Sequence, residues 1–223
     1  MGIHDGHRER LKQRFIDNGI ESFNEINLLE LLLFYSIPRK DTNEIAHNLI
    51  NQFKSFEGVL SAPVSELINV PGISLNSAVF LKLIHSVSKY NAVKKTDSNV
   101  AVKNSEIAAK YLLPRFMYET DELVMLMCLD SNKKIKFCGE ISRGIVNSVD
   151  INARLIAELS FKNKASSIIL AHNHPDGNVD PSNEDISTTR YLANALNGIG
   201  ISLVDHIIIS NNDYSSLCDL GLL

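Results

Sequence analysis

The sequence contains 223 residues, which is enough for one large domain or two small ones with a buried core. Hydrophobic residues make up 44% and charged residues 22%, values that are ordinary for a soluble globular protein. The net charge of -4 argues against a protein that binds nucleic acid mainly through an overall positive charge.

The cysteines and the apolar segments indicate where the protein works. Cys128, Cys138 and Cys218 include no CxxC pair, which disfavours a disulfide framework or a thiolate zinc site. The N-terminal segment MGIHDGHRERLKQRF lacks the apolar core of a secretory signal, and the longest apolar run, LLELLLFYSI, is too short to span a bilayer. We therefore expect a cytoplasmic protein without membrane contact.

The first 90 residues have the apolar periodicity of helices. In the segment 42–53, Ile45 and Leu49 share one face, and Asp41 or Thr42 could cap its start. The polar stretch NAVKKTDSNVAVKN, residues 91–104, is predicted to be a linker, so we expect a helical domain at 1–95 and a second domain at 101–223. Helices are predicted at 8–18, 26–35, 42–53 and 78–87.

The second half alternates strand and helix patterns, which predicts an α/β domain. Buried strands are expected at 123–129 and 167–171, because both runs are short and apolar. A strand at 134–142 should pair with the first of these across a turn at 130–133. The remaining predicted elements are helices at 107–113, 153–161 and 184–196 and a last strand at 203–210.

The segment AHNHPDGNVDPSNEDI, residues 171–186, carries the clearest functional pattern. His172 and His174 are two residues apart at the end of an apolar strand, so both imidazoles can point to the same face. Asp185, on the next helix, can return a carboxylate to the same point. Two histidines and one carboxylate fill three tetrahedral positions and leave the fourth for water, as in a catalytic zinc site.

Each part of this segment also has an ordinary explanation. An isolated HxH is more often accidental or a hydrogen-bonded pair than a metal site. Ser182 and Asp185 match a helix capping box, and capping is the better explanation for Ser182 taken alone. The whole pattern, H-x-H-P followed after six residues by S-x-x-D, is much harder to reach by chance.

That pattern resembles the signature of the JAMM (MPN-plus) metalloproteases. The forms HNHPDG and PSNED, the pair Asp205-His206 in LVDHIII and the ending YSSLCDLGLL resemble the RadC branch of that family, and the resemblance spans nearly the whole chain. It implies a helical, helix-hairpin-helix-like N-terminal region. An α/β JAMM/MPN domain should follow, with a mixed sheet like that of cytidine deaminases.

The resemblance also implies the roles of single residues. His172, His174 and Asp185 would bind one zinc ion per chain, and Ser182 would hold or polarise the developing oxyanion. The family has an upstream glutamate as general acid and base, and Glu122, immediately before LVMLMCLD, matches its position. The implied reaction is hydrolysis of an amide or isopeptide bond in an unidentified protein or peptide.

Some positions weaken or qualify these assignments. Glu140 competes with Glu122, since it also lies on an expected strand, and the ordinary explanation for Glu122 is a solvated carboxylate at a strand start. Asn173 stands where JAMM deubiquitinases usually have Ser or Thr, and Asp176 where RadC relatives commonly have Ser. RadC relatives also tend to have Pro-Arg-Glu before the central helix, and of these three residues only Arg154 is present here, in Ala153-Arg154-Leu155. The metal ligands are unaffected, but the substrate surface could differ.

Two other functions stay open. LINVPGISLNSAVFL, residues 67–81, resembles a helix-hairpin-helix turn whose backbone N–H groups can meet a phosphate, as in a DNA repair or replication protein. Because Ser74 replaces the usual second glycine and few basic residues lie nearby, a plain packing unit with at most weak DNA contact is favoured. The other function is a non-catalytic MPN scaffold that binds proteins, against which the intact ligands argue. His206 is expected to be a core histidine, with a supporting role of Asp205-His206 behind the ligands as the alternative.

Overall fold

The computed structural model describes residues 6–96, 100–144, 152–175 and 177–223. The chain divides into two compact units, residues 1–88 and 89–223. Helix α6 (Leu75–Thr96) runs past this division, so residues 91–96 of the predicted linker are in fact helical. The predicted domain limits at residues 95 and 101 stay a prediction. In the described part of the chain, no helix combines the length and the apolar character needed to cross a membrane.

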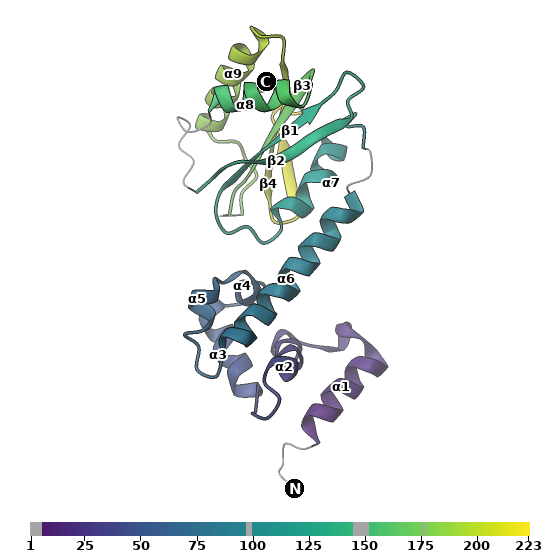
Figure 1. The fold of residues 1–223 in the computed structure, drawn as a ribbon, viewed down its shortest axis with the longest axis vertical. Coiled ribbons are helices and arrows are strands. Elements are labelled where there is room, and N and C mark those ends of the chain that lie inside the picture. The colour runs from purple at the N-terminus through teal and green to yellow at the C-terminus, as the bar shows by residue number, and fades with distance from the viewer. Residues whose placement is uncertain (1–5, 97–99, 145–151, 176) are drawn as a thin grey trace. The chain divides into compact units, whose positions relative to one another are not determined.

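The N-terminal unit consists of helices packed around an apolar core (Figure 1). Leu29, Leu33 and Leu49 are fully buried in that core. Asp41 Oδ1 accepts a hydrogen bond from the backbone N–H of Asn43 at 2.9 Å, so of the two expected caps it is the aspartate that binds the backbone of α3. The elements before α6 are α1 (His7–Asn18), the 3-10 helix η1 (Ile20–Ser22), α2 (Glu25–Ser36), α3 (Asn43–Phe53), α4 (Phe56–Ser61) and α5 (Val64–Leu67).

The VPGIS segment forms the turn between α5 and α6. Gly72 has a φ of 93°, and a Cβ at this position would lie 2.6 Å from Ile45 Cδ1, so both the backbone conformation and the packing on α3 favour glycine. Ser74 Oγ accepts a hydrogen bond from the backbone N–H of Ser77 at 3.2 Å. The serine at the place of the usual second glycine therefore caps the start of α6.

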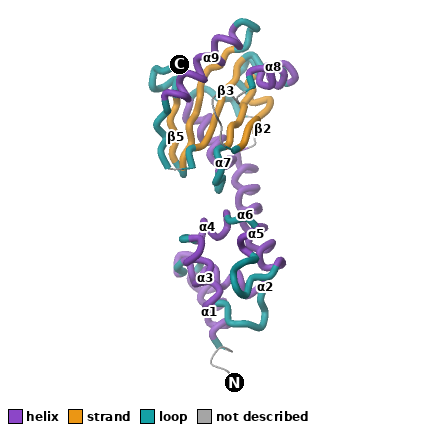
Figure 2. Tube along the Cα trace, turned by 90° about the vertical axis from the view of Figure 1, so that its left-hand side faces the viewer, coloured by secondary structure: helices purple, strands orange, loops and turns teal. Residues whose placement is uncertain are grey.

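The C-terminal unit contains one mixed sheet with the strand order β2-β1-β3-β4-β5 (Figures 1 and 2). Strands β3 and β4 are parallel, and the other neighbouring strands are antiparallel. This confirms the predicted fold class of a helical N-terminal part followed by an α/β domain. The elements are α7 (Ser105–Phe116), β1 (Leu123–Leu129), β2 (Ile135–Arg143), α8 (Ala153–Lys162), β3 (Ser167–Asn173), α9 (Asn183–Asn197), β4 (Ser202–Ser210) and β5 (Asp213–Ser216).

Helices cover both faces of this sheet. Strands β1 and β3 are buried along their whole length, which explains why their sequences are continuous apolar runs. Alternate residues of β1 face opposite ways: Met127 belongs to the same core cluster as Leu112 of α7. Leu126 instead joins Ile156 of α8 and Leu192 of α9. The sheet is therefore rigidly held, and it presents the end of β3 beside the start of α9.

The chain continues beyond the strand that the sequence predicts to be the last. After β4, Asn211 adopts a left-handed conformation with a φ of 53°, and β5 then pairs antiparallel with β4. Strand β5 reads DYSS, which is short and polar and lacks the apolar alternation of a typical strand. The prediction that 203–210 is the last strand is therefore wrong.

Candidate metal centre

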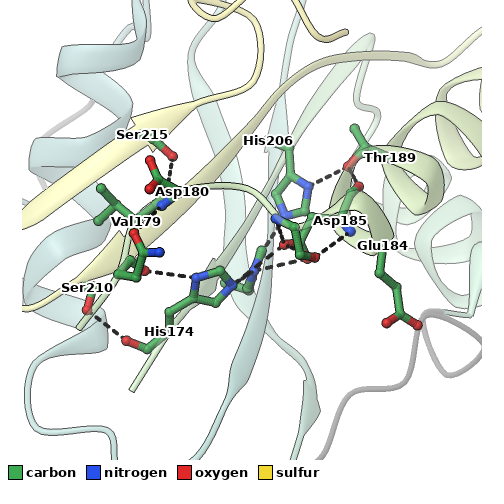
Figure 3. A network of polar contacts seen from close by, with 12 residues as sticks. His174, Val179, Asp180, Glu184, Asp185, Thr189, His206, Ser210 and Ser215 are labelled. Atoms are coloured by element: carbon green, nitrogen blue, oxygen red, sulfur yellow. Dashed lines mark hydrogen bonds and ion pairs between the residues drawn. The ribbon is translucent and has the colours of Figure 1, made fainter. Parts of the chain in front are cut away.

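Three side chains from two elements converge at the end of β3. His172 lies on β3, His174 follows directly after its last residue, and Asp185 lies in the first turn of α9. One possible ligand atom from each residue lies within 4.8 Å of the other two. The structure thus brings together all three of the residues that the sequence predicts as metal ligands, two of which, His174 and Asp185, are labelled in Figure 3.

The distances between these donor atoms suit a tetrahedral ion. The two histidine Nε2 atoms are 2.9 Å apart. Asp185 Oδ1 lies 3.3 Å from His172 Nε2, and Asp185 Oδ2 lies 3.6 Å from His174 Nε2. Zinc bound at about 2.0–2.1 Å places neighbouring tetrahedral ligands about 3.3 Å apart. The donor set of two imidazoles and one carboxylate therefore fits zinc in both geometry and chemistry.

The backbone and a carbonyl group fix the position of His174. Its N–H donates to Ile209 O at 2.8 Å, and its own carbonyl accepts from Ser210 Oγ at 2.7 Å, which ties it to β4. Its ring Nδ1 lies 2.9 Å from Asn178 O. Because a carbonyl can only accept, Nδ1 must carry the hydrogen, and Nε2 is left with a lone pair directed toward His172 and Asp185.

A second histidine stands directly behind His172. His206 Nε2 lies 2.8 Å from His172 Nδ1. On its other side, His206 Nδ1 lies 2.6 Å from Thr189 Oγ1, as Figure 3 shows. Asp205 has a different place: its carboxylate accepts hydrogen bonds from Ser216 Oγ at 2.8 and 2.7 Å and from the backbone N–H of Cys218 at 3.1 Å. The two members of the Asp205-His206 pair therefore serve different parts of the domain.

Asp185 and Ser182 form the capping box that the sequence suggests as the ordinary explanation. Asp185 Oδ2 accepts from Ser182 N at 2.8 Å and from Ser182 Oγ at 2.6 Å, and Asp185 N donates to Ser182 Oγ at 3.1 Å. The capping box and the metal ligand set thus coexist in the same residue. The sequence suggests them as alternatives, whereas the two oxygens of one carboxylate can serve both.

The protonation states at rest also suit a cation site. Burial would raise the pKa of Asp185, but the neighbouring His174 and His172 and the hydrogen bonds from Ser182 hold that pKa well below its usual value, so the carboxylate is ionised. Burial lowers the pKa of His172 to about 4. At neutral pH the site therefore presents an anion and a neutral imidazole, the forms that bind a metal.

The two candidate glutamates occupy different surroundings. Glu122 directly precedes β1, in which Val124 pairs with His172 of β3, so the strand register brings Glu122 to the same sheet end as the ligands. Glu140 lies on β2, one strand further out, and its carboxylate accepts from Arg143 at 3.0 and 2.9 Å. The register thus favours Glu122 as the glutamate of the site.

Asn173 fixes the backbone on both sides of Glu122. Its Oδ1 accepts from the backbone N–H of Leu123 at 2.7 Å, and its Nδ2 donates to the carbonyl of Asp121 at 3.0 Å. From the sequence, Asn173 appears only as a departure from the family pattern. Its place between two ligand histidines on a strand, where alternate side chains face opposite ways, is the signal that could have indicated this role.

The other positions marked from the sequence lie away from the ligands or outside the described residues. Arg154 is exposed on α8 and pairs with Glu158 at 3.2 Å. Asp176 lies outside the described residues. The sequence pattern gives no role to Thr189, which contacts His206. Its position four residues after Asp185 on α9, which places both on one helix face, is the signal that could have indicated it.

Comparison with known proteins agrees with this geometry. Residues 102–222 match the model of the RadC-like JAB domain. The chain belongs to the RadC-like JAB family. A UPF0758 protein of Fusobacterium nucleatum is 38% identical over 98% of this RadC-like chain and 97% of its own length. A UPF0758 protein of Ruegeria pomeroyi is 32% identical over 92% of each chain. The family assignment made from the sequence is confirmed.

Proposed function

We propose that this RadC-like protein is a zinc-dependent hydrolase, a metallopeptidase that cleaves an amide or isopeptide bond in a protein or peptide. One observation carries the proposal: His172, His174 and Asp185 each offer a donor atom, all three lie within 4.8 Å of one another, and the two histidine Nε2 atoms are 2.9 Å apart. Three protein ligands leave one tetrahedral position for water or substrate, which is the pattern of catalytic zinc sites. The free thiols of Cys128, Cys138 and Cys218 suit the reducing cytoplasm that we propose as its location.

The residues of the chain would divide the chemistry among them. When bound, zinc acts as a Lewis acid and lowers the pKa of water toward about 7. Glu122 would take a proton from the attacking water and deliver it to the leaving amine. Ser182 would donate its hydroxyl hydrogen to the developing oxyanion. That hydrogen faces Asp185 Oδ2 at rest, and the backbone N–H of Ser182 keeps the carboxylate capped when the hydroxyl turns.

Metal content gives the first test. Purified protein should hold about one zinc per chain by elemental analysis. The double variant His172→Ala/His174→Ala should lose this zinc yet keep its circular dichroism spectrum, because the sheet packs between α7 on one face and α8 and α9 on the other through other side chains. Full zinc occupancy in the double variant would rule out the assigned site.

Activity gives the second test. The zinc-loaded protein should cleave members of a peptide library, and the double alanine variant should not. If the zinc is bound and removed as expected but no amide or isopeptide substrate is cleaved, the scaffold alternative replaces the hydrolase. A zinc-loaded protein that cleaves a nucleic acid instead would favour the DNA-associated alternative.

A further inference from the structure

Three hydrogen bonds, two of them buried and one partly buried, lead from the first proposed ligand back to the helix that carries the third. His172 Nδ1 is 2.8 Å from His206 Nε2, His206 Nδ1 is 2.6 Å from Thr189 Oγ1, and Thr189 Oγ1 is 2.5 Å from the carbonyl oxygen of Asp185. The side chains lie almost wholly out of solvent, with residue exposures of 3% for His172, 2% for His206 and 0% for Thr189. Water therefore has little access to supply other partners for these atoms.

The chemistry of the last acceptor sets the direction of every hydrogen in these three hydrogen bonds. The Asp185 carbonyl has no hydrogen, so the Thr189 hydroxyl must donate to it. The hydroxyl has only that one hydrogen, so Thr189 Oγ1 accepts from His206 Nδ1–H. A neutral imidazole carries a single ring hydrogen, and since that of His206 lies on Nδ1, its Nε2 has only a lone pair.

The first ligand must then donate. Because His206 Nε2 can only accept, the hydrogen between the two rings belongs to His172 Nδ1. We infer that Thr189 and His206 are positioning residues that fix His172 as its Nδ1–H tautomer and so direct the Nε2 lone pair to the metal. The inference rests on the proposed zinc site. His174 reaches the same tautomer by a different route, through the carbonyl of Asn178.

The two tautomers together explain why the site needs a cation. Both Nε2 atoms are left without hydrogens, yet they lie 2.9 Å apart and near the Asp185 carboxylate. Lone pairs at that distance repel each other unless a metal ion or an added proton lies between them. The two tautomers therefore leave lone pairs on the ring atoms that would face a bound ion.

Variants of Thr189 test the role of these hydrogen bonds in metal binding, and the test needs no substrate. Thr189→Val keeps the shape but removes the hydroxyl, so His206 Nδ1–H loses its acceptor and the preference for the required tautomer of His172 is lost. Zinc affinity, measured by competition with a chromophoric chelator, should fall by about 10- to 100-fold, the range for partners that orient metal ligands. Thr189→Ser keeps the hydroxyl and should bind zinc like wild type.

A neighbouring residue provides the matched control. Thr188 is also buried on α9 but takes no part in these three hydrogen bonds, so Thr188→Val should leave zinc affinity unchanged. Equal loss in Thr188→Val and Thr189→Val, or no loss in Thr189→Val, would overturn the inference. If the wild-type protein binds no zinc, the proposed metal site fails instead.

The tautomer can be read directly, whatever the variants do. In the metal-free wild-type protein at neutral pH, two-bond ¹⁵N–¹H correlation spectra should show the hydrogen of His172 on Nδ1 and that of His206 on Nδ1. A hydrogen on Nε2 of His172 would overturn the inference even if zinc binds. This measurement needs neither the ion nor a stable variant.

Discussion

Asn173 contributes no donor atom to the proposed metal site, although it separates His172 from His174. Its side chain points away from the donors and binds the backbone at Asp121 and Leu123. The hydrogen bond to the Leu123 N–H is buried, so losing it would leave a polar group without a partner. This residue therefore couples the strand that holds the ligands to the segment that holds Glu122.

Replacing that side chain should separate stability and turnover from metal binding. Asn173→Ala should lower the free energy of unfolding by about 1–3 kcal/mol, the cost of an unsatisfied buried group. Zinc should stay bound, because no donor atom is removed, while turnover should fall as Glu122 loses its fixed position. Urea unfolding, elemental analysis and peptide hydrolysis check the three parts. Loss of zinc in Asn173→Ala would contradict this division of roles.

The two glutamates can be compared with isosteric changes. Glu122→Gln should keep zinc, because the residue is not a ligand, and should keep substrate affinity, because shape and size hardly change. Turnover should fall by at least the roughly 100-fold typical of a general acid–base group. Glu140→Gln should stay near wild type, since its carboxylate pairs with Arg143. The reverse pattern would show that Glu140 is the base.

For single residues, the sequence predicts which three side chains the structure brings together at the candidate site, but it does not predict the contact between Thr189 and His206. One continuous segment holds His172, His174 and Asp185, because a single connection joins the end of β3 to the start of α9. Their spacing in the sequence therefore suffices to indicate the candidate site. Thr189 and His206 become partners only when α9 packs against β4, and no local pattern records that contact. The acceptor for His174 is a backbone carbonyl, which any residue at position 178 could supply.

Among the elements, Glu119 ties together segments that are distant in sequence. It follows α7 and pairs with Lys89 of α6 and Arg143 of β2. Burial would raise the pKa of Glu119, but the hydrogen bonds and charges of Arg143 and Lys89 hold that pKa below its usual value. The ionised carboxylate is therefore the form that stabilises the fold.

Removing that charge should destabilise the protein in a pH-dependent way. Glu119→Gln should lower the free energy of unfolding by about 1–3 kcal/mol at pH 7. Since the folded pKa is the lower one, this stabilisation is present above the unfolded pKa of about 4.3 and is lost as the pH falls through the folded value. Urea unfolding at pH 7 and pH 3 should show the difference shrinking. Glu106→Gln, which removes an exposed pair with Lys110, should change little at either pH.

The elements that the sequence predicts best are those with an uninterrupted signal. Strands β1 and β3 are apolar throughout because both of their faces are covered. Helix α6 extends well past the predicted end at residue 87, because Lys94 and Lys95 continue a helix without needing an apolar face. Strand β5 is held by pairing with β4 and by polar side-chain contacts such as that of Ser216 with Asp205, so its polar sequence conceals it.

For the whole molecule, charge argues against tight DNA binding. The first 99 residues hold 11 basic and 11 acidic side chains. The two lysines near the helix-hairpin-helix-like turn are both engaged: Lys82 Nζ donates to Leu60 O at 2.8 Å and Ser61 O at 2.9 Å, and Lys89 pairs with Glu119. Neither lysine can therefore bind a phosphate at the turn unless its internal contacts break.

The full chain should accordingly bind duplex DNA weakly or not at all at physiological salt. Fluorescence anisotropy with a labelled duplex, repeated across salt concentrations, measures both affinity and the number of phosphate contacts. Tight binding with a steep salt dependence would instead support the DNA-associated function. Lys82→Ala would then show whether the turn between α5 and α6 makes the contact.

Asp185 caps the start of α9, so its proposed role as a metal ligand would link ion binding to the closing of the first helical turn. Its carboxylate faces two histidines and also accepts the N–H and O–H of Ser182 that begin the helix. An ion that fixes this carboxylate also holds the first helical turn closed, and by reciprocity a tightly closed turn favours the ion. Amide hydrogen exchange in the first turn of α9 should therefore slow when metal is added. Slower amide exchange at the start of α9 would in this way report whether the proposed metal site is occupied.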